Sequence, residues 1–402
     1  MNIHHYWNKS LNYIEFIFSG DEVQYFYKSS FKIYLPSVIQ NFDAIHPDRW
    51  GFILVLAVFP RINRITLTSF GISQALHDTL RVGNICVEPV MPDLKPFQTY
   101  RDGHVGIAYS GGIHSYITAA LLGSSARLVS VGRKQDTYEE ETEQSKKYLP
   151  DGMYYSMSVM ETKGYSVKLL QTNVQDLYDP RIQSFQFPLL SGMGIILLGE
   201  QLNLHSICYG SCFFDPECIY PNKQNALLFR NGTKLYISDF QINMTIDYWR
   251  SLFSIIGLHL DFPTCGMSDL FAVHILQKHN LMNDICVCKH SYPSCNKCID
   301  CYYYNLIIQI IPPSSTLLME DVWHACLYLF PDMCNIEKYQ RYTLMWILLM
   351  QNNKQTSILP NLEKYRHTRI FYKPHQDTLH NASDANRDQI QKGWEYLVAS
   401  IQ

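Results

Sequence analysis

Apolar, β-branched runs alternate with helical windows from residue 104 onward, and this alternation constrains the fold more than any other feature of the sequence. In chain order, the strand-like runs and helical windows are 104–109, 115–123, 127–132, 139–148, 166–172, 188–203 and 205–210. Such alternation is typical of a parallel sheet with helices packed on its faces. We therefore expect an α/β fold built on a parallel sheet.

The first hundred residues predict a smaller α+β part. Two runs with strand composition, Tyr13–Phe18 and Glu22–Tyr27, flank a glycine-containing turn and predict a hairpin. A helix is expected from Pro47, because proline suits a first helical turn, and Pro60 should end it. Further along are an expected strand, helix and proline-rich linker, at 65–67, 74–82 and 89–96.

Composition excludes several classes of protein. Hydrophobic residues make up 47% of the chain and charged residues 17%, which excludes a disordered or highly solvated chain. The net charge of -3 argues against general electrostatic binding to nucleic acid. No apolar run reaches the roughly 18 residues of a membrane span, and the start lacks the pattern of a secretory signal. We expect a cytoplasmic protein with no membrane segment.

A glycine turn follows the first expected parallel strand, with the sequence Ser-Gly-Gly-Ile-His-Ser at 110–115. Glycines let a ligand approach the backbone closely, and the N-terminus of the following helix attracts negative charge, so this layout binds phosphate without a lysine. The hydroxyl groups of Ser110 and Ser115 would add donors. An ordinary structural turn is the alternative, but the strand before it and the helix after it favour nucleotide phosphate binding.

A cysteine cluster is the strongest motif in the chain. Cys295, Cys298 and Cys301 have C-x₂-C-x₂-C spacing, and Cys286 or Cys288 would supply a fourth thiolate. Four thiolates complete a tetrahedral zinc site and leave no position open for catalysis, so we expect a structural Zn²⁺. An iron–sulfur cluster is the competing interpretation.

With its glycine turn, the chain resembles the PP-loop ATP pyrophosphatase superfamily, whose signature is Ser-Gly-Gly-x-Asp-Ser after the first strand of the sheet. The resemblance implies that ATP is cleaved to AMP and pyrophosphate, which adenylates a carboxylate or carbonyl oxygen so that ammonia, an amine or sulfur can displace AMP. The residues expected to bind the nucleotide are Ser110, Gly111, Gly112, His114, Ser115, Gly132, Arg133 and Asn173.

Three of these residues lie at expected strand ends, where open α/β sheets bind ligands. Gly132 and Arg133 end the second strand and are expected to contact the adenosine part of the nucleotide. Asn173 follows the third strand. An isolated strand-end Asn is more often a turn residue, so its role in the site depends on the resemblance.

The chain departs from the superfamily signature at His114, where the family has Asp. Imidazole is a poor Mg²⁺ ligand, so direct Mg²⁺ coordination at this position is not expected. His114 would instead hydrogen-bond a phosphate, with Ser110 beside it as the second expected catalytic residue. The alternative is a protein that binds nucleotide but has lost catalysis.

The cysteine cluster resembles that of 7-cyano-7-deazaguanine synthase, a PP-loop enzyme family with a C-x₆₋₉-C-x₂-C-x₂-C zinc site, and this likeness favours Cys288 over Cys286. Asn296 stands where that family usually has Gly, and Asn tolerates positive φ. His46-Pro47-Asp48 and Thr172-Asn173 also look like motifs of an uncharacterised family of PP-loop proteins with an N-terminal extension. Relatives of the synthase occur in anti-phage defence systems.

The resemblance implies an ATP-dependent ligase or synthase that forms a C–N bond by amidation, nitrile-type or conjugation chemistry on a small-molecule or protein carboxylate acceptor. A regulatory or defence protein without turnover is the alternative, and a homodimer is left open. Four parts are expected. Residues 1–98 form an N-terminal α+β extension and residues 99–260 a PP-loop nucleotide-binding domain. Residues 261–310 form a helix with the zinc ribbon, and residues 311–402 a C-terminal helical region. This last region should end in an amphipathic helix with its apolar face formed by Ile390, Trp394, Leu397, Val398 and Ile401.

Overall fold

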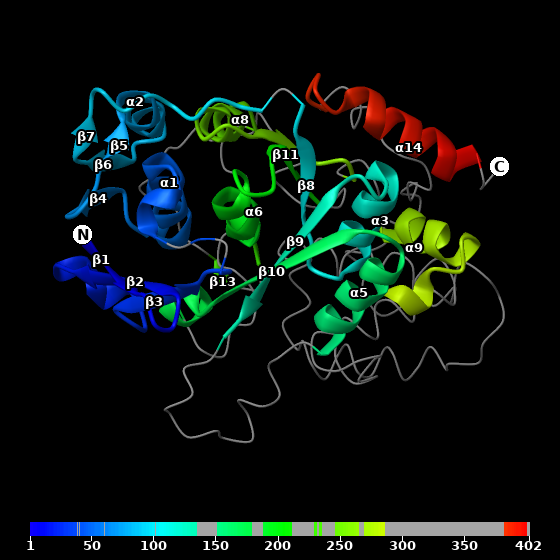
Figure 1. The fold of residues 1–402 in the computed structure, drawn as a ribbon, viewed down its shortest axis with the longest axis horizontal. Helices are drawn as coiled ribbons and strands as arrows, with labels where there is room; N and C mark the ends of the chain where they lie inside the picture. The colour runs from blue at the N-terminus through cyan, green and yellow to red at the C-terminus, as the bar shows by residue number, and fades with distance from the viewer. Residues whose placement is uncertain are drawn as a thin grey trace, which may run out of the picture.

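A large, mostly parallel sheet with helices on both faces organises the fold (Figure 1). The computed structural model describes residues 1–37, 39, 41–59, 61–100, 102–134, 151–178, 188–210, 229–230, 233–234, 246–264, 269–285 and 382–399. Within these ranges the sheet has ten strands, in the order β14-β11-β8-β9-β10-β3-β2-β1-β4-β6. The α/β class and the parallel sheet expected from the sequence are confirmed.

Five parallel strands form one half of the sheet. They are β8 (His104–Ala108), β9 (Arg127–Arg133), β10 (Ser166–Thr172), β11 (Leu204–Tyr209) and β14 (His259–Asp261). The chain moves outward from β8 through β9 to β10 and then returns to place β11 on the other side of β8. The strand order therefore reverses between β8 and β11, and open α/β sheets bind ligands at such a position, at the carboxyl ends of the strands.

The N-terminal strands extend this sheet. They are β1 (Asn2–Asn8), β2 (Tyr13–Ser19), β3 (Ser30–Tyr34), β4 (Arg64–Leu67) and β6 (Cys86–Glu88). β3 pairs antiparallel with the end of β10, where Ile33 lies opposite Thr172. The short strands β5 (Ile72–Ser73) and β7 (Val90–Met91) pair separately, as do β12 (Phe229–Arg230) and β13 (Thr233–Lys234). Residues 1–98 and 99–260 thus share one sheet, while the expected four-part division stays a prediction.

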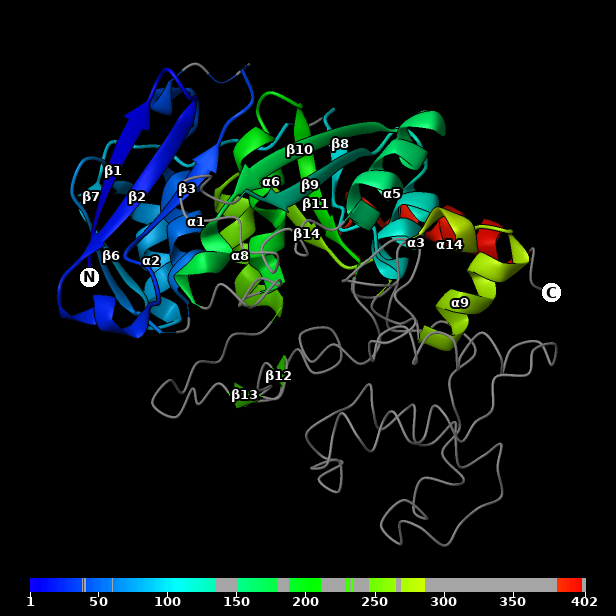
Figure 2. The ribbon, with the colours of Figure 1, turned by 90° about the horizontal axis from the view of Figure 1, so that it is seen from below.

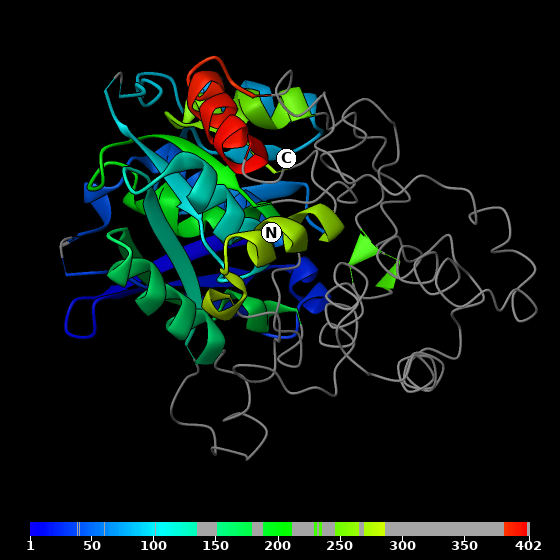
Figure 3. The same ribbon diagram turned by 90° about the vertical axis from the view of Figure 1, so that its right-hand side faces the viewer.

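Helices cover both faces of the sheet. α1, α6 and α8 lie on one side of the parallel strands, with α2 against α8, and α3, α5, α9 and α14 lie on the other side (Figures 1 and 2). Figure 3 shows the second group from its outer side, with α14 in red and α9 in yellow-green. Their bounds are α1 Pro47–Val58, α2 Gln74–Val82, α3 Ile113–Leu122, α5 Asp151–Thr162, α6 Met193–Leu198, α8 Ile246–Ile255, α9 Asp269–Lys278 and α14 Arg387–Ala399.

Arg49 joins helix α1 to the parallel half of the molecule. This side chain is fully buried, and its guanidinium donates from Nε to the carbonyl oxygen of Ile256 (3.2 Å) and from Nη1 to that of Ile196 (3.1 Å). The guanidinium carbon also lies 4.4 Å from the centre of the Phe97 ring. Burial lowers the pKa of Arg49 to about 10, so the side chain is still charged at neutral pH. The two halves therefore share a core as well as a sheet.

Most elements expected from periodicity are confirmed, including the helices that begin at Pro47 and at Gln74 and the strands from 104 to 210. The expected strand at Glu22–Tyr27 is wrong, because a short 3₁₀ helix, Asp21–Tyr25, occupies this position and contains no buried residue. β2, which alternates buried and partly exposed residues, pairs instead with β1 and β3. A segment without a side chain to bury gains little from joining a sheet.

The helix expected at 188–203 is interrupted. A 3₁₀ helix, Pro188–Gly192, precedes the short α6, and a Cβ atom at Gly192 would lie 2.0 Å from the Tyr209 hydroxyl oxygen, so tertiary contact requires glycine there. The helix expected at 139–148 lies outside the described residues.

The C-terminal amphipathic helix is confirmed as α14. Its residues Ile390, Trp394 and Leu397 are buried, as the expected apolar face requires. The side chains of Val398 and Ile401, expected on the same face, lie outside the described part of the structure. Among the helices that the structure describes, none is both long and apolar enough to cross a bilayer.

Candidate functional site

The glycine turn lies between the carboxyl end of β8 and the start of α3, beside the point where the strand order reverses (Figure 1). Gly111 has a φ of 77°, a backbone conformation that favours glycine. Gly112 is the N-cap residue of α3, and its position makes no side-chain cap hydrogen bond. The first backbone N–H groups of a helix have no intrahelical partner and attract anions. This is the chemistry that the sequence predicts for 110–115.

Two serines hold the shape of the turn. The Ser115 hydroxyl donates to the carbonyl oxygen of Gly112 (2.9 Å) and accepts from the backbone N–H of Ser110 (3.3 Å). The Ser110 hydroxyl accepts from the backbone N–H of Gly112 (3.4 Å) and lies 3.2 Å from the Ser115 hydroxyl. The two side chains predicted to contact phosphate therefore also determine the conformation of the turn.

The turn is enclosed on two sides and open on a third. A Cβ atom at Gly210, just after β11, would lie 2.3 Å from the backbone nitrogen of Ser115. A Cβ atom at Gly111 would lie 3.2 Å from Cβ of Ser156 in α5. At Gly112 the nearest such contact within the described part of the chain is the Ser110 hydroxyl at 3.5 Å. Gly112 is therefore where a ligand can approach the turn, and Gly210 is a site residue that the sequence analysis missed.

His114 lies in the first turn of α3 and is 8% exposed. Its carbonyl carbon would be 2.5 Å from a Cβ atom at Gly210, so the backbone of β11 and the start of α3 approach one another closely. The structure thus places Ser110, Gly111, Gly112, His114 and Ser115 at one helix N-terminus, whereas their contact with a nucleotide stays a prediction.

Buried tyrosines support the turn from the α5 side. The hydroxyl groups of Tyr109 and Ser156 are 2.6 Å apart, and Ser156 donates to the carbonyl oxygen of Asp284 (3.2 Å). The Tyr116 hydroxyl donates to the Asp284 carboxylate (2.9 Å), which also pairs with Lys163 (3.0 Å). Burial raises the pKa of both tyrosines, and the hydrogen bond to Asp284 raises that of Tyr116 further, so both stay neutral. The sequence analysis did not single out this network.

β9 and β10 extend beyond the end of β8. The last residue of β8, Ala108, pairs with Val129, and β9 continues for four more residues to Arg133. At about 3.3 Å per residue this is an overhang of roughly 13 Å. Gly132 faces α5, because a Cβ atom there would meet Leu169 (3.1 Å) and Met153 (3.5 Å). The predicted strand-end residues therefore share the carboxyl edge of the sheet with the glycine turn but lie farther along the strands.

Asn173 contacts the backbone of β3. Its side-chain oxygen accepts from the N–H of Lys32 (2.6 Å), and its own N–H donates to the carbonyl oxygen of Lys32 (3.2 Å). The hydroxyl of Thr172 donates to the same oxygen (2.7 Å). These contacts make Asn173 part of the junction between β10 and β3, whereas a nucleotide contact for it stays a prediction.

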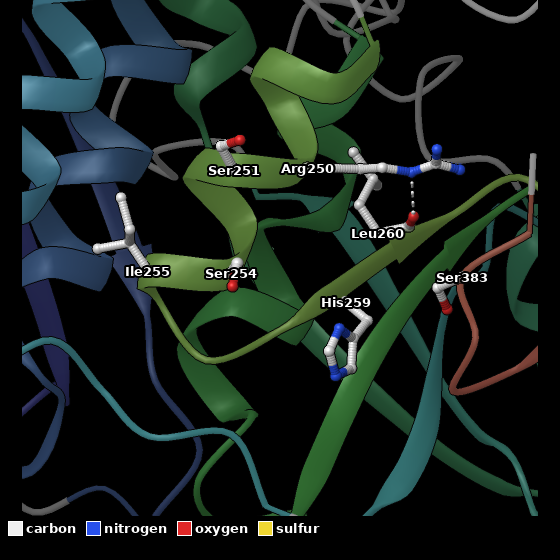
Figure 4. A pocket seen from close by; sticks show the side chains of 7 residues that line it. All are labelled: Arg250, Ser251, Ser254, Ile255, His259, Leu260 and Ser383. Atoms are coloured by element: carbon white, nitrogen blue, oxygen red, sulfur yellow. Dashed lines mark hydrogen bonds between the residues drawn. The ribbon is translucent and has the colours of Figure 1, made fainter.

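A cavity of about 430 Å³ lies elsewhere, beside the edge strand β14 (Figure 4). Arg250 donates from Nε to the carbonyl oxygen of Leu260 (3.3 Å) across this cavity wall. The cavity is lined by Arg250, Ser251, Ser254, Ile255, His259, Leu260 and Ser383. Since the last residues of α8 and the first residue of β14 line it, the cavity is at the amino end of that strand. Ligands of open α/β sheets bind at the opposite end.

The expected zinc ligands Cys288, Cys295, Cys298 and Cys301 lie outside the described residues, as does Cys286. Within the ranges that are described, no group of three or more His, Cys, Asp or Glu side chains is arranged to hold a metal ion. Cys208, in β11, is fully buried.

Residues 248–392, less than half of the chain, match a family described as a family of unknown function (DUF6395). No curated protein and no solved structure matches the chain. The matched segment begins in α8 and ends in α14, so it includes the lining of the cavity beside β14 but not the glycine turn.

Proposed function

We propose that the protein is a PP-loop enzyme that binds ATP at residues 110–115 and adenylates a carboxylate or carbonyl acceptor. The observation that carries the proposal is the glycine turn at the N-terminus of α3, with no side-chain cap, beside the reversal of strand order. Three features of a phosphate site coincide there: a turn with a positive φ at Gly111, a helix N-terminus, and open backbone at Gly112.

The proposed reaction has two steps, adenylation of the acceptor and displacement of AMP, and each site residue would have a role in it. An acceptor oxygen attacks the α-phosphorus of ATP, the bond to the β-phosphate oxygen breaks, and pyrophosphate leaves with the electron pair. A nitrogen or sulfur nucleophile then displaces AMP. Backbone N–H groups at the start of α3 would stabilise the phosphates, and Ser110 and His114 would donate to the leaving pyrophosphate. Gly132 at the end of β9 would lie along the adenosine part.

Metal ions enter the proposal in limited roles. Zn²⁺ at Cys288, Cys295, Cys298 and Cys301 would be structural, because four thiolates leave no open position. Mg²⁺ would accompany ATP itself, since the histidine at position 114 is a poor ligand for it. The acceptor is a small-molecule or protein carboxylate, and the compartment is proposed to be the cytoplasm.

A second candidate function follows from His114. A chain that has replaced the family's carboxylate could bind nucleotide without turnover and act as a regulatory or anti-phage defence protein. ATP binding would then persist while AMP formation is absent with every acceptor.

The test is ATP binding by calorimetry, together with an assay for AMP and pyrophosphate across a panel of carboxylate acceptors. Gly112→Val should weaken ATP binding at least about tenfold, because its methyl groups fill the space through which phosphate reaches the backbone. Ala120→Val, two turns along the same helix, is the matched control and should bind ATP normally. A folded Gly112→Val protein with unchanged ATP affinity would reject the PP-loop assignment.

A further inference from the structure

Arg133 occupies the face of the sheet opposite α5. A Cβ atom at Gly194 in α6 would meet Val129 (2.6 Å) and Val131 (3.4 Å), so these residues of β9 face α6. Side chains alternate along a strand, so Arg133 continues the α6 face beyond the helix. Gly132, the neighbouring strand-end residue, lies on the α5 face instead, and the expected adenosine contact of both residues stays a prediction.

The Arg133 guanidinium is buried and incompletely paired. The side chain is 8% exposed, and its Nη2 donates to a carboxylate oxygen of Asp176, in the 3₁₀ helix Val174–Leu177 after β10. Among the residues that the structure describes, its Nε and Nη1 have no hydrogen-bond partner, and both atoms are shielded from solvent. A buried donor without a partner is unfavourable, and more so when it is charged. Two such donors on one cation indicate that an acceptor is missing.

The charges around Arg133 are also unbalanced. The carboxylate of Asp176 receives a second cation, Lys28, whose Nζ lies 3.5 Å from it. Within the described part of the chain, the buried Arg133 and the partly exposed Lys28 therefore share one carboxylate, and neither cation pairs with a second one. Buried charges are ordinarily paired, so the cluster is suited to an additional anion.

Both halves of the molecule build this cluster. Lys28 comes from the segment before β3, and β3 fixes the end of β10 through the contacts of Lys32 with Thr172 and Asn173. Arg133 ends the overhang of β9, at the carboxyl edge of the sheet and beyond the glycine turn. The N-terminal strands thereby position a cation beside the edge where open α/β sheets bind ligands.

We propose that Arg133 and Lys28 form a second anion subsite, distinct from the glycine turn, for an oxyanion of the acceptor molecule. A carboxylate or a phosphate group fits, because each offers oxygen acceptors to the unpaired guanidinium N–H groups. The assignment of the oxyanion to the acceptor rests on the proposed function, whereas the subsite itself rests on the cluster. The N-terminal strands then have a direct part in substrate recognition.

The test is calorimetric titration of the full-length protein with inorganic phosphate and with acetate, each with and without saturating ATP. Arg133→Gln should weaken binding of at least one anion about tenfold in the presence of ATP. Arg127→Gln makes the same change at the other end of β9, where the arginine contacts His104 (3.1 Å), and should have no effect. Preference for phosphate or for acetate identifies the chemistry of the group.

Lys28→Met provides a second variant if Arg133→Gln fails to fold. It leaves the Arg133–Asp176 pair intact and removes a partly exposed cation, so the fold should survive while anion affinity falls. Anion binding that is equal in Arg127→Gln and Arg133→Gln, and unaffected by Lys28→Met, overturns the subsite.

Two further outcomes separate the subsite from the proposed function. Phosphate binding that is lost only in Gly112→Val and is displaced by ATP places the anion at the glycine turn, which rejects the subsite and supports the ATP site. Phosphate or acetate binding that depends on Arg133 in a protein that does not bind ATP supports the subsite and rejects the proposed function.

Discussion

At the residue scale, position 114 separates an enzyme from a binding protein. His114 lies in the first turn of α3 and is buried, next to the helix N-terminus where a phosphate is proposed to bind. If His114 donates to the leaving pyrophosphate, its contribution is to the transition state and affects the rate more than ATP affinity.

His114→Ala is therefore expected to keep ATP affinity within a few fold and to slow AMP formation. His114→Asp should slow it as well, most strongly at low magnesium, because a carboxylate beside phosphate is repulsive without a bridging cation. AMP release and ATP binding are measured together, with His4→Asp on β1 as the control. Faster AMP release in His114→Asp would instead show that the natural chain is a degenerate binder.

A different residue, Asp48, carries a buried carboxylate in the first turn of α1. One of its oxygens accepts from the N–H of Ser73 (2.7 Å), and the other lies 3.8 Å from Nδ1 of His46 and has no hydrogen bond within the described residues. Burial raises the pKa of Asp48 above its ordinary value of 3.8, although the hydrogen bonds from Ser73 oppose this shift. The folded state thus binds this proton more tightly than the unfolded state. The free energy of unfolding should therefore fall as the pH rises from the ordinary pKa of the carboxyl group through its raised pKa in the folded state.

Asp48→Asn is expected to remove this loss of stability, because its amide oxygen can still accept from Ser73 and carries no charge. Urea unfolding at pH 4 and pH 7 should show a smaller decrease with rising pH than in the natural chain. The exposed Asp93→Asn is the control and should leave the difference unchanged. If Asp48→Asn loses as much stability between pH 4 and pH 7 as the natural chain, burial of the Asp48 carboxylate is not the cause of that loss.

At the element scale, the contact of β11 with the start of α3 sets the geometry of the glycine turn. The backbone after β11 approaches the helix so closely that only hydrogen fits at Gly210. A helix displaced there would move its N–H groups relative to the end of β8. The turn is therefore positioned by a strand that lies about a hundred residues away in the sequence.

Gly210→Ala should destabilise the fold by about 1–3 kcal/mol, since the added methyl overlaps the backbone of Ser115. Gly112→Ala adds the same methyl in open space and should cost less than about 1 kcal/mol, as expected for an N-cap change. Chemical denaturation compares the two variants. Equal free energies of unfolding would contradict the close approach.

At the scale of the whole molecule, Asp261 brings together the two ends of the segment that matches the family of unknown function. Its carboxylate accepts from the N–H (2.6 Å) and hydroxyl (2.5 Å) of Ser383 and from the amide of Asn386 (2.6 Å). Trp394 in α14 donates to the carbonyl oxygen of Pro263 (3.1 Å). The chain from β14 to α14 therefore starts and ends at one place, and the cysteine cluster belongs to the intervening sequence.

Metal removal should act on this part of the chain. Cys295→Ser is expected to lose zinc and to increase proteolysis within 261–310 before the sheet unfolds, because metal binding and local folding are coupled. Cys86→Ser, on β6, is the control. Elemental analysis that finds iron, or less than about half an equivalent of zinc, would contradict the four-thiolate site.

The sequence by itself determined most of the local elements and the glycine motif, although not the 3₁₀ helices at Asp21–Tyr25 and Pro188–Gly192. Alternation of apolar runs located β8 to β11, prolines located the two ends of α1, and the glycine turn was evident from 110–115, because each depends on neighbouring residues. Only the tertiary structure decided that β3 joins β10, that Gly210 contacts the start of α3, and that Arg133 shares Asp176 with Lys28. These pairings join residues far apart in the chain, and local periodicity does not encode which strand or charge lies beside which.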